Sequence, residues 1–104
     1  MIRVKIRNEN GHYSAVSDGH AGWCAGNDIV CAAVSAIMFT LMGAIENLSM
    51  AGLRENGIAD GHIDISCKPK SDEDRFVASV LFNAAIIGIL QLQEEYPDYV
   101  RLEE

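Results

Sequence analysis

The sequence predicts an α+β fold in which two long helices pack on one small sheet. Short segments near the start, middle and end of the chain alternate apolar and polar residues, as half-buried strands do. Two long stretches, 29–45 and 76–93, carry no charge and are typical of buried helices. Because 104 residues suffice for one modest core, we expect a single domain over residues 1–104 with the element order β-β-α-β-α-β.

The first two elements are predicted to form a β-hairpin. Ile2, Val4 and Ile6 alternate with basic residues, which is the pattern of a strand with one buried face. Residues 8–11 are rich in Asn and end in Gly, and this composition favours a tight turn. Residues 12–17 can therefore return as a second strand.

A loop and a long helix follow the hairpin. The segment 21–27 contains two glycines and is expected to form a surface loop. Asn27 or Asp28 can accept hydrogen bonds from the first N–H groups of a helix that we predict over residues 28–50. Its apolar residues cover more than one stripe, so this helix should be central and mostly buried.

The second half of the chain adds one helix and two strands to the prediction. Residues 51–61 are expected to be a polar connection. A third strand alternates apolar and polar residues and ends near Pro69. A second helix, over 71–96, starts with acidic residues that suit the positive end of a helix, and residues 99–103 form a short last strand.

Charge and composition exclude some classes of function. The net charge of −7 disfavours a nucleic-acid binder, because phosphate contacts need a basic face. Basic residues at 3, 5 and 7 interrupt any early apolar run, so we expect no signal peptide and a cytoplasmic protein with reduced thiols. The two uncharged stretches approach the length of a membrane span. Their polar residues and missing aromatic belts favour a soluble protein instead.

Cys31 is the candidate nucleophile. It lies in the first turn of the predicted helix, whose N–H groups can lower the pKa of a thiol. His20 precedes it by a glycine-bearing loop that can fold back and bring the imidazole to the sulfur. The imidazole would then protonate the leaving amine. On spacing alone, a helical cysteine is more often a small buried hydrophobe. Cys67, near the end of a predicted strand, is expected to be buried or incidental.

Two motifs carry a resemblance to a known family. The sequence GHA at 19–21 is followed, after a short loop, by GNDIVCAAVSA at 26–36. Together they closely resemble the bacterial ribosomal-processing cysteine protease family, called Prp. The length, the paired first strands and the acidic start of the second helix are similar too. The resemblance implies a cysteine endopeptidase whose catalytic dyad is His20 and Cys31, and which needs no metal or organic cofactor.

The resemblance also implies a substrate and an assembly. Members of the family remove a short N-terminal extension from a large-subunit ribosomal protein, ribosomal protein L-twenty-seven, after an aromatic-rich stretch. The expected partners are therefore this precursor and a second copy of the chain, because the resemblance implies assembly as a homodimer. Two alternatives stay open: a thiol-redox or sensor protein that uses Cys24 and Cys31, and a non-catalytic ribosome-assembly module.

Other residues have candidate roles around the dyad. Asp28 can orient His20 or cap the helix. Ser35, one turn beyond Cys31, should face the same side, where it can donate a hydrogen bond to the site or to a helix carbonyl. Trp23 can contact aromatic side chains of a substrate or anchor its loop. We expect no metal site, because neither a paired CxxC nor a histidine cluster accompanies the thiols. The predicted substrate-binding loop comprises Gly19, Ala21, Gly22, Trp23 and Gly26.

Overall fold

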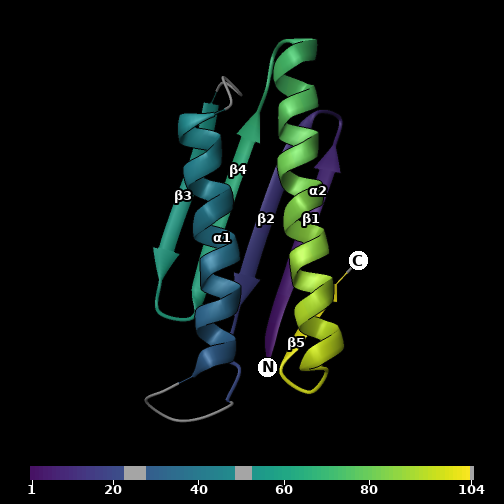
Figure 1. The fold of residues 1–104 in the computed structure, drawn as a ribbon. Coiled ribbons are helices and arrows are strands. Elements are labelled where there is room, and N and C mark those ends of the chain that lie inside the picture. Colours follow the sequence, from purple (N-terminus) through teal and green to yellow (C-terminus); the bar gives the residue numbers. More distant parts are fainter. Residues whose placement is uncertain (23–27, 49–52, 104) are drawn as a thin grey trace.

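The computed structural model describes residues 1–22, 28–48 and 53–103, with the side chains of 53–56 left aside (Figure 1). These residues form five strands and two helices. The elements are β1 (Ile2–Glu9), β2 (His12–Asp18), α1 (Ile29–Asn47), β3 (Leu53–Ala59), β4 (His62–Lys68), α2 (Asp72–Glu95) and β5 (Val100–Glu103).

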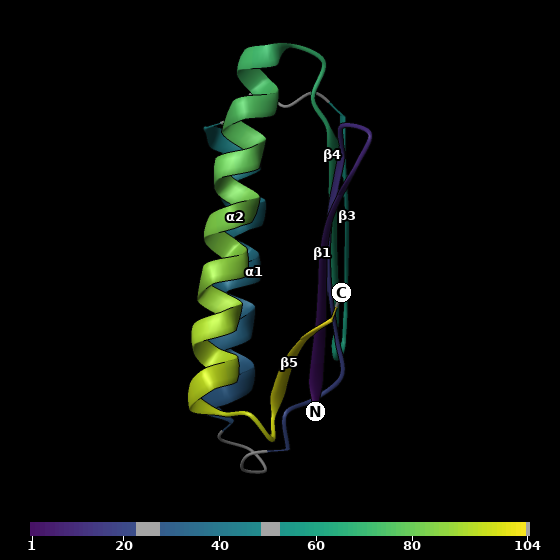
Figure 2. The same cartoon turned by 90° about the vertical axis from the view of Figure 1, so that its right-hand side faces the viewer.

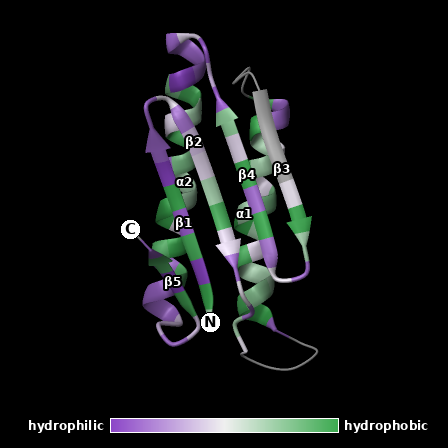
Figure 3. Cartoon of the chain, turned by 180° about the vertical axis from the view of Figure 1, so that it is seen from behind, coloured by the Kyte–Doolittle hydropathy of each residue, from purple (hydrophilic) through white to green (hydrophobic). Residues whose placement is uncertain are grey.

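The five strands form one mixed sheet in the order β3-β4-β2-β1-β5. Only the β1–β5 pair is parallel among these four strand pairs. Both helices lie on the same face of the sheet, as the side view in Figure 2 shows. Seen from behind in Figure 3, the opposite face of the sheet has no helix over it, and β1 alternates hydrophobic and hydrophilic residues. The predicted α+β class is confirmed.

The predicted connection over 51–61 is wrong for residues 53–59, which form the edge strand β3. This strand pairs antiparallel with β4, with Ile58 opposite Ile63 and Ala59 opposite His62. Its sequence lacks the alternation of a half-buried strand, because an edge strand can be polar when its neighbour supplies the backbone hydrogen bonds. The element order is therefore β-β-α-β-β-α-β.

The core lies between the helices and the sheet. Each helix buries one stripe of side chains at intervals of three or four residues. The buried residues are Val30, Val34, Met38, Leu41 and Ile45 on α1, and Ala78, Phe82, Ala85 and Ile89 on α2. The expectation that the first helix is mostly buried is thus wrong. A two-layer fold covers each helix on one side only, so apolar residues on the other side stay exposed.

The two helices resemble membrane spans in their length and composition. Both are long and apolar enough to cross a membrane by length and composition alone. This is weak evidence for a span, because a core helix of a soluble protein passes the same test. Both helices here have a stripe packed against the sheet.

Candidate active site

Gly19 turns the chain sharply at the end of β2 and sets the position of His20. Its φ of +101° is a conformation that glycine adopts without strain. A Cβ at this position would lie 2.5 Å from the carbonyl oxygen of Met1, so the backbone leaves no room for a side chain. The Gly19 N–H donates to the carbonyl of Gly61 at 2.8 Å, which ties this turn to the β3–β4 turn.

Cys31 lies in the first turn of α1, and Asp28 is the N-cap of that helix. The Asp28 carboxylate accepts hydrogen bonds from the backbone N–H groups of Val30 at 3.0 Å and Cys31 at 2.9 Å. The predicted capping role of Asp28 is therefore confirmed. The Cys31 sulfur accepts a hydrogen bond from the backbone N–H of Ala21 at 3.2 Å, so the backbone at Ala21 lies against the thiol.

His20 and Cys31 both line one cavity of about 230 Å³. Ser35 also lines it, as its place one turn after Cys31 predicts. Gly22, at φ +75°, has open space where a Cβ would stand. Trp23, Cys24 and Gly26 lie outside the described residues. The remaining residues that line the cavity are Ile2, Ser17, Gly19, Val34, Phe39, Ile58, Ala59, Asp60, Gly61, His62 and Ile63.

The surroundings of Cys31 favour the protonated thiol. Burial raises the pKa of the Cys31 thiol; the hydrogen bond from Ala21 opposes this, and the Asp28 carboxylate reinforces it. The expectation that the helix end lowers this pKa is wrong for this state of the protein. Asp28 explains the difference, because its carboxylate already accepts the N–H groups of Val30 and Cys31 and places a negative charge near the sulfur.

The imidazole of His20 rests against the β3–β4 turn. Its Nε2 atom lies 3.7 Å from the Asp60 carboxylate. A Cβ on Gly61 would lie 2.7 Å from the same nitrogen. The connection predicted over 51–61 includes Asp60 and Gly61, but the sequence prediction gives neither residue a role at the site. An Asp-Gly pair before the alternating strand is a hairpin signal that can reveal this turn from the sequence.

A second histidine, His62, lines the same cavity, whereas a second cysteine, Cys67, lies in the core. The Nδ1 atom of His62 lies 3.3 Å from the Asp18 carboxylate. Cys67 is buried in the core, as predicted, and burial raises the pKa of its thiol. Among the described residues, no group of three or more His, Cys, Asp or Glu side chains is placed to hold a metal ion.

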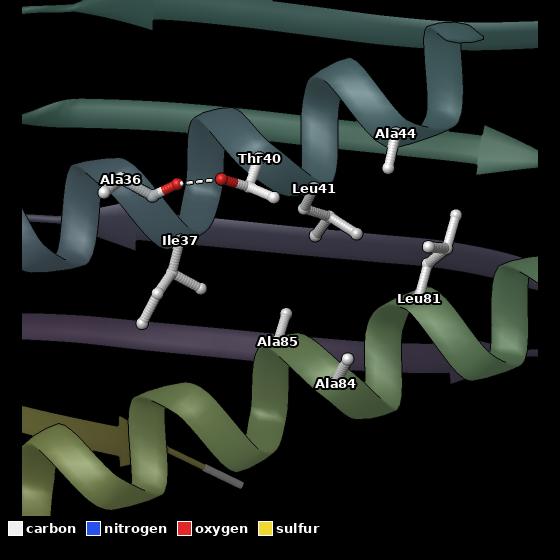
Figure 4. Close-up of a pocket in the computed structure, with 8 residues that line it drawn as sticks. All are labelled: Ala36, Ile37, Thr40, Leu41, Ala44, Leu81, Ala84 and Ala85. Atoms are coloured by element: carbon white, nitrogen blue, oxygen red, sulfur yellow. Dashed lines mark hydrogen bonds between the residues drawn. The ribbon is translucent and has the colours of Figure 1, made fainter. Parts of the chain in front are cut away.

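A larger cavity, of about 310 Å³, lies between the two helices (Figure 4). Its lining is almost wholly apolar, and the close-up shows Thr40 donating its hydroxyl to the carbonyl of Ala36 at 2.7 Å. No thiol, imidazole or carboxylate lines it. The smaller cavity with His20 and Cys31 is therefore the candidate active site. The lining residues of the larger cavity are Ala36, Ile37, Thr40, Leu41, Ala44, Leu81, Ala84 and Ala85.

Comparison with known proteins also indicates a cysteine protease. Residues 1–101 match the family described as cysteine protease Prp. A curated relative, the ribosomal processing cysteine protease Prp of Staphylococcus aureus, is 26% identical over 106 residues, which covers 97% of this chain and 94% of the relative.

Solved structures resemble the fold over nearly its whole length. One is the essential ribosomal processing protease Prp from S. aureus with a covalently linked product peptide, at a TM-score of 0.81 and 32% identity, covering 99% of this chain and 98% of that one. The same protease with a substrate peptide gives 0.78 and 30%, with the same coverage. A protein from Streptococcus mutans gives 0.77 and 31%, covering 99% and 92%.

Proposed function

The chain belongs to the Prp family of cysteine proteases, and from this premise we propose that it removes the N-terminal extension of ribosomal protein L-twenty-seven. The family and the curated relative establish the general class, a cysteine protease of ribosomal processing. The finer proposal names the substrate and the residues that cut it. The solved complexes of the S. aureus relative with a substrate and a product peptide support a peptide substrate.

The observation that carries the proposal is the shared cavity of His20 and Cys31. Because its surroundings raise the pKa of the Cys31 thiol, the thiol needs a base to take its proton when substrate binds. We assign this role to His20. The thiolate then attacks the peptide carbonyl, and the imidazolium returns the proton to the leaving amine. In a second step His20 takes a proton from water, and the resulting hydroxide attacks the acyl carbonyl. The bond to the Cys31 sulfur then breaks, the sulfur regains the proton from His20, and the N-terminal peptide leaves as an acid.

Backbone N–H groups supply the electrostatic part of the mechanism. The Ala21 N–H, 3.2 Å from the Cys31 sulfur, stabilises the developing thiolate. Because the Asp28 carboxylate already accepts the N–H groups of Val30 and Cys31, we propose that backbone N–H groups of the loop predicted over 21–27 stabilise the oxyanion of the tetrahedral intermediate. Trp23 is proposed to contact the aromatic residues before the cleaved bond.

The partners and the location follow from charge and from the family. The net charge of −7 suits a basic polypeptide, because opposite charges steer the encounter. We propose that the protein acts in the cytoplasm, as a homodimer, on the precursor before or during assembly of the large subunit.

The test is cleavage of the host's own precursor of ribosomal protein L-twenty-seven. We expect intact-mass measurement to show the loss of one defined N-terminal peptide. The Cys31→Ala and His20→Ala variants should lose at least about a hundredfold in rate, the scale that general acid–base catalysis provides. Activity that survives Cys31→Ala would contradict the proposal.

Matched variants separate the dyad from its neighbours in sequence. Cys24→Ser should keep the activity, whereas the redox alternative requires Cys24 and predicts its loss. His12→Ala removes an imidazole at the opposite end of β2 and should keep the activity as well. Precursor binding without cleavage by the wild-type protein would favour the assembly module instead.

A further inference from the structure

The β3–β4 turn has a feature that the proposed dyad does not use. Asp60 and Gly61 both line the catalytic cavity, and both lie against the imidazole of His20. A general acid–base histidine needs one ring nitrogen facing the nucleophile and a partner at the other nitrogen that fixes the tautomer. In this cavity, that partner must lie close to the imidazole of His20.

Asp60 is the carboxylate that lies beside the His20 ring. Its oxygen lies 3.7 Å from His20 Nε2, an ion-pair distance that is too long for a hydrogen bond. The Asp28 carboxylate accepts two N–H groups at the start of α1. The Asp18 carboxylate lies 3.3 Å from the ring of His62.

Gly61 lies beside the same ring and is bonded to the residue before it. Its carbonyl accepts the Gly19 N–H at 2.8 Å, so the residue before His20 is tied to this turn. Its own Cα stands so close to His20 that a Cβ would lie 2.7 Å from Nε2. The imidazole therefore occupies the space that any other residue at position 61 would fill.

We propose that Asp60 and Gly61 are positioning residues for His20, with Nε2 turned to Asp60 and Nδ1 left for the Cys31 thiol. This inference rests on the proposed role of His20. The negative charge of Asp60 favours the tautomer with its hydrogen on Nε2. When substrate binds, the proton on Sγ moves to Nδ1, the hydrogen on Nε2 stays in place, and Asp60 stabilises the imidazolium. The proton on Nδ1 then passes to the leaving amine.

The first experiment removes the carboxylate. We expect Asp60→Ala to lower kcat for precursor cleavage about fivefold with KM retained, the scale that an exposed ion pair provides. Asp60→Glu keeps the charge and should recover part of the loss. Asp64→Asn is the control, because it removes one negative charge on β4 at a residue that does not line the cavity.

Nitrogen NMR of the His20 ring gives a readout that does not depend on substrate. The ring of the wild-type protein should carry its hydrogen on Nε2 at a pH where it is neutral, and Asp60→Ala should weaken this preference. An unchanged kcat together with an unchanged tautomer in Asp60→Ala would overturn the role of Asp60. Full activity of His20→Ala would instead overturn the dyad, so the two failures are distinguishable.

The second experiment fills the space under the ring. Gly61→Ala should displace the imidazole and lower kcat about a hundredfold, as expected when a reacting group moves by about 1 Å. Gly11→Ala is the matched control. Gly11 also lies in a hairpin turn at positive φ, +81° against +69°, but its Cβ would meet only the Arg75 side chain, at 3.9 Å.

The comparison separates strain from displacement. Both variants add a side chain at positive φ and should lose similar stability in thermal unfolding, so a difference in kcat reports the ring alone. A Gly61→Ala variant that is folded and as active as Gly11→Ala would overturn the role of Gly61. If Gly61→Ala fails to fold, the Asp60 variants still decide whether this turn positions His20.

Discussion

Cys31 has a thiol that its surroundings hold in the protonated form, and this has a measurable consequence. Burial and the Asp28 carboxylate raise the pKa of the Cys31 thiol, against the hydrogen bond from Ala21. Since alkylation needs the thiolate, we expect iodoacetamide to modify Cys31 of the free enzyme slowly at neutral pH. The rate should rise with a midpoint above that of an ordinary cysteine, measured by peptide mapping of the labelled protein.

Asp28→Asn provides the control for this profile. Asparagine still caps a helix, but it removes the negative charge that raises the pKa of Cys31. The midpoint of alkylation should therefore move to lower pH while α1 keeps its stability. A wild-type midpoint near neutral pH, or an upward shift in Asp28→Asn, would contradict this account of the thiol.

At the residue scale, the sequence predicts the identity of the site better than its electrostatics. His20, Cys31 and Ser35 line one cavity because the GHA turn and the first turn of α1 are local features that a motif records. The direction of the pKa shift at Cys31 depends on where the Asp28 carboxylate points and how deeply the sulfur lies. Those are properties of packing, which spacing along the chain does not contain.

At the element scale, the connection from β2 to α1 depends on Gly19. We expect Gly19→Ala to destabilise the fold by about 2 kcal/mol or more, since it combines positive φ with a contact of 2.5 Å to the Met1 backbone. Urea unfolding measures this loss, and cleavage activity should fall because His20 moves. Gly57→Ala is the control on β3, where a Cβ would make an ordinary contact of 3.7 Å with Asp64.

The elements with strong local patterns are those that the sequence predicts. The first hairpin and both helices have clear periodicity, caps or turn residues, and each forms within a few residues of its expected bounds. The strand β3 has no such pattern. It forms because β4 offers a paired edge, and tertiary pairing of this kind overrides a weak local preference. The Asp60-Gly61 turn, by contrast, has a local hairpin signal in its Asp-Gly pair, although the strand before it has none.

At the scale of the whole molecule, we propose that two copies of the chain meet through the exposed side of α2. Four apolar residues on this helix lie within one face and are 45–70% exposed. They are Phe76, Val80, Ile87 and Leu90. No charged residue occurs from 76 to 93, so two chains of net charge −7 can approach along this stretch without placing like charges opposite one another.

The last prediction is therefore that the protein is a dimer through this face of α2. Val80→Glu puts one charge in its middle and should convert the dimer to a monomer in light scattering after size exclusion, because a buried unpaired charge is costly. Glutamate is a good helix former, so the fold should persist. Ser66→Glu adds the same charge on β4, next to the buried Ile65 and Cys67, whose side chains point to the helices. It should leave the dimer intact. A monomeric wild-type protein, or a Val80→Glu variant that stays dimeric, would contradict this interface, and the proposed catalytic dyad would be unaffected by either result.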